Sequence, residues 1–460
     1  MASSGRELSA VLDDLGVGMY HLAVAVFCSG VMLADGAEML LVSGIAAAMD
    51  GELEMGKMSR GLLVSSSFAG MQIGNLLSGP LSGRYGRRRI CMASIWLVSF
   101  FGLLCAVVQT LAQLFLVQIS LGCAIGIGGP SAVTLLTEVT PTGQRGAMQN
   151  TTGFAFVLGE FWTALGLLFL MPDLRGPWRM LCIWGVLPAF FAIPLGLLVQ
   201  ESPSWLLLHG KNKELQDLLA KIQKLHKKAE VDIVVQEKNR GCSASLPSVW
   251  HEITNGGHCR TVVISAYLAF LMNYLFYGTT FAFTQIFSES EGDWTSPAME
   301  MLIVSAAELV GILLAWLLLL HPTLGRITTL RVLCLAAALC SAALMSVVYG
   351  EFIIADPAAY TLKALVSIMF TILYLYISEV LPVTLRASGV GLCMGIGRLG
   401  SVAAPAVYGI GYHIHRTASP FLLSLVLLSL LGGIAAGFLV VETIGRPLDD
   451  GQLELAEVSR

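Results

Sequence analysis

Long apolar runs divide this chain of 460 residues. About 20 consecutive apolar residues span a bilayer as one helix, and twelve runs of at least about that length are present. They lie at residues 20–48, 61–83, 90–109, 111–137, 147–170, 178–200, 261–287, 297–321, 327–350, 357–380, 387–411 and 418–441. The pattern predicts an all-α membrane protein with twelve transmembrane helices. The leader of residues 1–19 is polar and the first run is far longer than the core of a signal peptide, so no cleavage is expected.

A long polar segment, residues 201–260, separates the first six runs from the last six. The expected domains are a six-helix half at 1–200, a cytoplasmic central loop at 201–260, and a second six-helix half with a short tail at 261–460. Within the loop, apolar residues recur at helical spacing among lysines, at Leu215, Leu218, Leu219, Ile222 and Leu225. They predict an amphipathic cytoplasmic helix that lies either against the bundle or on the anionic inner leaflet.

Composition supports the membrane assignment. Hydrophobic residues make up 55% of the chain and charged residues only 13%, against roughly 25% charged in an average soluble protein. Lys and Arg gather in loops that follow even-numbered runs, which predicts cytoplasmic termini by the positive-inside rule. The membrane is expected to be the plasma membrane or that of an intracellular vesicle. No basic stripe suggests nucleic acid. The sequence has no nucleotide-binding loop, nucleophile elbow or metal-ligand spacing. We therefore expect that the protein is not an enzyme and that it binds no cofactor or metal.

Acidic residues inside the apolar runs are the first candidates for function. Asp35 and Glu38 lie three residues apart in the first run, so both are expected on one helix face. A carboxylate near the bilayer centre costs a few kcal/mol, so such groups usually face a bundle interior or a water-filled path. Burial and a neighbouring like charge favour the protonated form, which makes the pair a candidate proton site. A static, hydrogen-bonded pair is the alternative. Glu160, in the fifth run, could line a pathway or make a structural hydrogen bond.

A short glycine- and arginine-rich loop follows the second run. Its glycines permit a tight turn and its basic residues favour the cytoplasm. The segment resembles the loop between the second and third helices of the major facilitator superfamily, whose basic residues lock one half-bundle at its cytoplasmic face. The resemblance implies such a role for Gly79, Arg84, Gly86, Arg87 and Arg88. Gly83 stands where that family usually has an acid. A loop that only sets topology is the alternative.

Further motifs follow in the order found in sugar and organic-ion porters. They are Glu138 with Arg145 after the fourth run, Glu201 in Glu-Ser-Pro-Ser-Trp-Leu after the sixth, Arg326 between the eighth and ninth, Glu379 and Arg386 between the tenth and eleventh, and Glu442 after the twelfth. This ordered set identifies the chain as similar to the major facilitator superfamily, with the organic-ion and synaptic-vesicle-related carriers as the most similar branch. The resemblance implies two six-helix repeats that hold a substrate near the midplane.

The second half adds four candidate substrate residues. Asn273 and Tyr277 lie in an aromatic segment similar to that of synaptic-vesicle-related carriers, and Glu308 resembles a buried acid of the same group. Arg398 lies about 18 Å along its helix from Arg386, at roughly 1.5 Å per residue. Its planar guanidinium suits a carboxylate, which could belong to a substrate or to a helix such as the one that bears Glu379.

The functional hypothesis is a secondary transporter that moves a small organic solute, an organic anion or carboxylic acid, by alternating access with proton coupling. Asp35 with an acid three residues later also resembles an element of proton-coupled aromatic-acid and organic-anion symporters. One alternative is a facilitative sugar or polyol carrier, which the central-loop motif favours. Another is a membrane scaffold or receptor that keeps the fold without transport, which Gly83 and Ser120, the latter in place of a frequent arginine, make conceivable.

Overall fold

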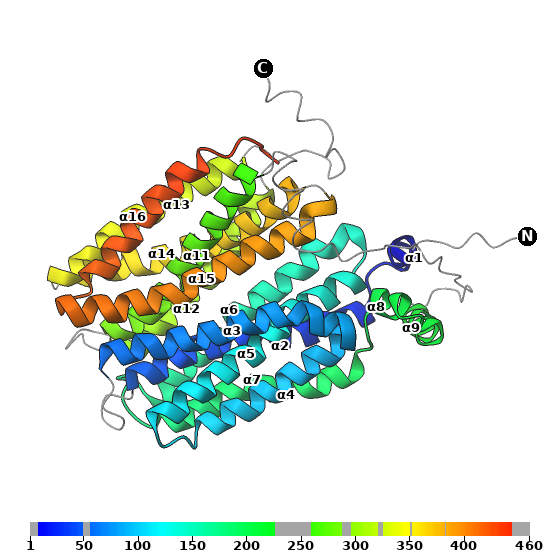
Figure 1. Ribbon diagram of the computed structural model, residues 1–460, viewed down its shortest axis with the longest axis horizontal. Coiled ribbons are helices and arrows are strands. Elements are labelled where there is room, and N and C mark those ends of the chain that lie inside the picture. The colour runs from blue at the N-terminus through cyan, green and yellow to red at the C-terminus, as the bar shows by residue number, and fades with distance from the viewer. Residues whose placement is uncertain are drawn as a thin grey trace, which may run out of the picture. The chain divides into compact units, whose positions relative to one another are not determined.

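The computed structural model describes residues 8–48, 56–225, 259–287, 296–320, 325–349, 352–381 and 383–443. Each of the twelve apolar runs coincides with one helix over most of its described length (Figure 1). These are α2 (Met19–Ala48), α3 (Lys57–Tyr85), α4 (Arg87–Cys105), α5 (Leu111–Val139), α6 (Arg145–Leu170), α7 (Trp178–Leu198), α11 (Cys259–Phe287), α12 (Pro297–Leu320), α13 (Arg326–Ala343), α14 (Phe352–Val380), α15 (Val383–His415) and α16 (Ser419–Ala436). The all-α prediction is confirmed.

Eleven of the described helices are long and apolar enough to cross a membrane. The twelfth, α3, has 29 residues but a low mean apolarity, because Ser, Gly and two basic residues occupy much of its first half. The ninth run ends differently from the expectation: α13 stops at Ala343 and continues as the 3₁₀ helix η2 (Leu344–Tyr349). The short connection between α4 and α5 ends in a capping box, in which the side chains of Thr110 and Gln113 accept hydrogen bonds from each other's backbone N–H groups.

The chain forms two compact units. Unit 1 comprises residues 1–45, 69–171 and 175–241, and unit 2 comprises residues 46–68, 172–174 and 242–460. Helix α3 therefore contributes its first half to unit 2 and its second half to unit 1. The expected division at residues 200 and 261 stays a prediction.

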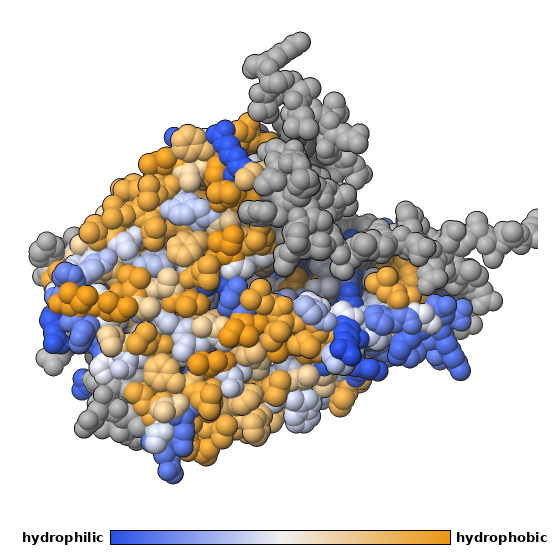
Figure 2. All heavy atoms as spheres, in the orientation of Figure 1, coloured by the Kyte–Doolittle hydropathy of each residue, from blue (hydrophilic) through white to orange (hydrophobic). Residues whose placement is uncertain are grey.

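Three short helices among the described residues lie at one end of unit 1 (Figure 1): α1 (Leu8–Leu15), α8 (Pro203–Leu208) and α9 (Asn212–Leu225). A 3₁₀ helix, η1 (Thr142–Gln144), connects α5 to α6. Helix α9 is the expected amphipathic helix. Its Leu215, Leu218, Leu219 and Ile222 are buried, whereas Leu225 is exposed. Lys221 of α9 donates to the carbonyl of Leu198 at 3.4 Å. The apolar face of α9 therefore packs against the rest of unit 1, and hydrophilic side chains gather on its outer face (Figure 2).

Candidate functional site

In unit 1, two glycines allow α2 and α6 to cross closely. A Cβ at Gly36 would overlap the backbone of Phe156, and a Cβ at Gly159 would overlap the carbonyl of Leu33. Thr163 then donates from α6 to the carbonyl of Ala37 at 2.7 Å. This crossing fixes the part of α2 that carries the acidic pair, and it brings the acidic residue after Gly159 beside α2.

The three acids predicted within the apolar runs of unit 1 are all removed from solvent. Asp35 is 5% exposed, Glu38 4% and Glu160 1%. Glu38 lies near Gln118 on α5 and close enough to Asp35 for an electrostatic interaction between the two acids. Gln118 also donates to the sulfur of Cys105 at 3.6 Å. The predicted proximity of Asp35 and Glu38 is therefore present, and Gln118 is a buried partner that the sequence reading missed.

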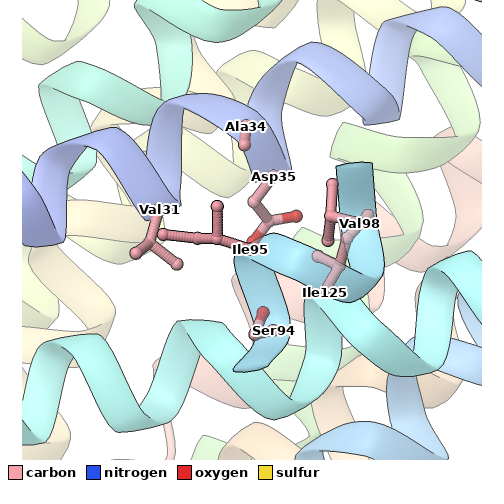
Figure 3. A pocket seen from close by; sticks show the side chains of 7 residues that line it. All are labelled: Val31, Ala34, Asp35, Ser94, Ile95, Val98 and Ile125. Atoms are coloured by element: carbon pink, nitrogen blue, oxygen red, sulfur yellow. The ribbon is translucent and has the colours of Figure 1, made fainter. Parts of the chain in front are cut away.

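Asp35 points into a small cavity between α2, α4 and α5 (Figure 3). The walls are Val31, Ala34, Asp35, Ser94, Ile95, Val98 and Ile125. The space amounts to about 10 Å³ for a water centre, close to the minimum that holds one water molecule. Ser94 donates to the carbonyl of Ala124 at 2.7 Å. The cavity is too small for an organic solute, but its volume suits one water molecule beside the carboxyl group of Asp35.

In unit 2, small residues bring α15 against α11. A Cβ at Gly400 would overlap the carbonyl of Phe270, and a Cβ at Gly397 would lie 2.9 Å from Nδ2 of Asn273. Arg398, between these two glycines, donates a hydrogen bond to the hydroxyl of Tyr277, and its guanidinium carbon lies 5.3 Å from the centre of that ring. The structure thus brings together three of the predicted residues, Asn273, Tyr277 and Arg398.

Helix α14 completes this cluster. Tyr374 lies near the side chain of Asn273 and close enough to Arg398 for an electrostatic interaction with its guanidinium. Phe276 and Phe370 stack edge to face with ring centres 5.3 Å apart. A half-buried guanidinium beside phenol and phenyl rings forms a surface that suits an organic anion, because the cation can bind the acidic group while the rings contact its apolar part.

Glu308 has a partner that the sequence reading missed. Lys363 of α14 lies 2.5 Å from Glu308 Oε1, and both side chains are completely buried. Gly311, one turn after Glu308, allows the approach, because a Cβ there would lie 2.5 Å from the carbonyl of Ala364. The signal was available: a lone lysine in the apolar run 357–380 is as unusual as Asp35 in the first run.

The acidic and basic motif residues of unit 1 form a network at one end of the bundle. Glu201 accepts from the backbone N–H of Arg88 at 2.9 Å, beside Gly86, whose φ of 107° favours glycine. Glu138 pairs with Arg87 at 3.0 Å and accepts from Ser202. Arg88 also donates to the carbonyl of Gly196 at 3.0 Å.

Other loop residues of unit 1 contribute less to this network. Where the family usually has an acid, the carbonyl of Gly83 accepts from the indole of Trp205 at 2.8 Å. Arg145 donates to the carbonyl of Thr140 at 3.2 Å. Arg84 and Gly79 are exposed.

Unit 2 repeats the arrangement. Glu442 accepts from the backbone N–H groups of Arg326 at 2.6 Å and Ile327 at 3.1 Å. Glu379 lies 3.7 Å from Arg326 and accepts from Thr443 at 2.6 Å. The recorded contacts of Glu379 are therefore with this network, not with Arg398. The side chain of Arg386 lies outside the described residues.

Comparisons with known proteins agree with the fold. Residues 37–454 match the family of sugar (and other) transporters. The chain is 23% identical to the organic cation/carnitine transporter 7 of Arabidopsis thaliana over 95% of both chains. It is 25% identical to the synaptic vesicle 2-related protein of Rattus norvegicus, covering 95% of this chain and 81% of that protein. Organic anion transporter 3 of the same species is 27% identical, covering 83% and 69%.

Solved structures show the same architecture. The xylose transporter XylE from E. coli, in a partially occluded inward-open conformation, superposes with a TM-score of 0.74 at 18% identity, covering 93% of this chain and 99% of that one. A crystal structure of a D-xylose-proton symporter gives a TM-score of 0.75 at 16% identity, with 93% and 100% covered. The predicted major facilitator fold is confirmed.

Proposed function

Since the chain belongs to the sugar (and other) transporter family of the major facilitator superfamily, we propose that it carries a small organic anion, such as a carboxylate, in symport with protons. At the coarser level it is a multi-pass membrane transporter and not an enzyme. The proposal assigns the anion to unit 2 and the proton to unit 1.

The contact of Arg398 with Tyr277 carries the anion assignment. A guanidinium binds a carboxylate through two parallel hydrogen bonds, and Asn273 and Tyr374 add polar groups beside it. The neighbouring aromatic side chains favour an anion with an apolar or aromatic body. A relative named as an organic anion transporter supports this class of substrate.

The proton assignment rests on the buried acids Asp35, Glu38 and Glu160. A single buried carboxylate is costly when charged, and two interacting ones oppose each other's ionisation. Protonation of one acid relieves this repulsion and deprotonation restores it, which is the property a coupling site needs. The similar D-xylose-proton symporter supports a proton as coupling ion in this fold.

In the proposed orientation both termini lie on the cytoplasmic side of the membrane, which is the plasma membrane or that of an intracellular vesicle. The basic residues Arg87, Arg88 and Arg89 and the exposed lysines of α9 lie at one end of unit 1, in agreement with the positive-inside rule. Protease protection of a tag at each end of the chain in sealed cells tests this orientation, since a cleaved tag on intact cells would contradict it.

The test of function is uptake into proteoliposomes by the purified full chain. The panel contains phthalate as an aromatic carboxylate, benzenesulfonate, tetraethylammonium and xylose, each with and without a pH gradient. We expect saturable, gradient-driven uptake of an aromatic anion. Arg398→Gln should lower that uptake roughly 30- to 150-fold, since a charge-assisted hydrogen bond contributes about 2–3 kcal/mol.

Arg331→Gln is the matched control, because Arg331 is an exposed arginine on another membrane helix, α13. Anion uptake that Arg398→Gln leaves unchanged would contradict the proposed site. Xylose uptake that ignores the pH gradient would favour a facilitative sugar carrier. If no solute is transported and none raises the unfolding temperature, a non-transporting scaffold becomes the better account.

A further inference from the structure

The ammonium group of Lys363 lies in a cluster of oxygen atoms from two other helices of unit 2. Its Nζ is 2.5 Å from Oε1 of Glu308 on α12. On α11 it lies 2.5 Å from the hydroxyl of Thr280 and 3.4 Å from the carbonyl of Phe276. An ammonium has three N–H donors, so these three oxygens match its donor number.

The hydroxyl and the ring of α11 are oriented to receive a cation. Thr280 donates its own hydrogen to the carbonyl of Phe276 at 2.9 Å, so its lone pairs are left for Lys363. The Nζ atom also lies 4.1 Å from the centre of the Phe276 ring, whose face attracts cations. One carboxylate, one hydroxyl, one carbonyl and one aromatic face therefore surround a single positive charge.

Such a set contains only groups that attract a cation. Carbonyl and carboxylate oxygens at membrane depth are the groups that hold exchangeable coupling ions in other transporters. Without a cation, the completely buried carboxyl of Glu308 would either carry an uncompensated charge, at a large penalty in a membrane interior, or take up a proton. The four groups therefore suit a monovalent cation, and Lys363 supplies one that is covalently attached to the chain.

We propose that Glu308, Thr280 and the Phe276 carbonyl form a monovalent-cation site whose permanent occupant is the ammonium of Lys363. The site accepts a free alkali or alkylammonium ion once that side chain is shortened. In the native chain the tethered cation holds α14 against α11 and α12 and takes the place of an exchangeable metal ion. The site shares Phe276 with the anion cluster proposed above, but the argument for it does not depend on the transport of an anion or a proton.

The test is thermal unfolding of the full-length Lys363→Ala variant in detergent. This substitution removes three methylene groups and the ammonium, which n-propylammonium replaces. We expect n-propylammonium to raise the unfolding temperature saturably and to restore about half or more of the loss, as a ligand specific for the folded state does. Sodium should give a smaller saturable rise. Wild type should respond to neither ion.

Two solutes serve as controls at matched concentration. Tetramethylammonium has the charge but not the shape or the N–H donors, and propan-1-ol has the stem without the charge. If these solutes stabilise Lys363→Ala as well as n-propylammonium does, or if n-propylammonium stabilises the wild type equally, the proposal is wrong.

If Lys363→Ala fails to fold, the unfolding temperatures of two near-isosteric variants test the proposal instead. Lys363→Met leaves the Glu308 carboxylate without a cation, whereas the double variant Glu308→Gln with Lys363→Met removes both charges. The proposal predicts that the double variant unfolds at a clearly higher temperature than Lys363→Met. Equal unfolding temperatures would overturn it.

Discussion

The two units carry opposite charges at membrane depth. Asp35, Glu38 and Glu160 place three buried carboxylates in unit 1. Unit 2 contributes the cations Lys363 and Arg398, of which Lys363 is neutralised by Glu308. By contrast, the networks around Glu201 in unit 1 and Glu442 in unit 2 are nearly the same. The two units are therefore alike in the networks that cap helix ends, and they differ in the buried charged residues at the proposed ion-binding positions.

The largest effect is expected from Glu308→Gln. The substitution leaves the buried ammonium of Lys363 without its counter-charge, which should lower the free energy of unfolding by about 3–5 kcal/mol. Glu38→Gln is the matched change in unit 1, where loss of one acid relieves repulsion with Asp35. It should leave the unfolding temperature unchanged or raise it. Equal destabilisation by both variants would contradict the contrast between the units.

A medium effect is expected at the glycine crossing of α2 and α6. Gly36→Ala places a Cβ against the backbone of Phe156, and overpacking of this kind costs about 1–3 kcal/mol. Gly153→Ala is the control on α6, since its Cβ would meet open space. It should be neutral or slightly stabilising, because alanine favours a helix over glycine by about 1 kcal/mol. Unfolding temperatures of both variants test the crossing, and a neutral Gly36→Ala would refute it.

The smallest effects should come from the two loop networks. Glu201→Gln and Glu442→Gln each weaken a charged acceptor at the first turn of a helix, which contributes about 0.3–1 kcal/mol. Similar small losses in both variants would support the repeat. A loss in one variant several times that of the other would show that the two networks have different roles.

Helix positions were predictable from the sequence because length and apolarity alone determine which segments span a membrane. The exception in composition, α3, was still recognisable as a helix-length run between polar loops. Motif residues such as Arg87 and Glu138 were identified through their resemblance to a family, and the structure shows that they pair.

The partners of the buried charges were not predictable in the same way. The contact of Glu308 with Lys363 joins α12 to α14, and that of Arg398 with Tyr277 joins α15 to α11. Which residues meet depends on close crossings at Gly311, Gly397 and Gly400, and crossing positions follow from three-dimensional packing rather than from periodicity. The sequence shows Lys363 as a charged residue in an apolar run. It does not show that Glu308 lies beside this lysine, so the role of Lys363 could not be predicted.

We propose that unit 1 binds the proton and unit 2 binds the anion. The most direct test is gradient-driven phthalate uptake by the Asp35→Asn, Glu38→Gln double variant in proteoliposomes. The wild type should accumulate phthalate against its concentration gradient when the outside is acidic. The double variant should still exchange phthalate across the membrane, because the unit 2 site is intact, but it should not accumulate it. Accumulation at the wild-type level would contradict proton coupling through the acids of unit 1.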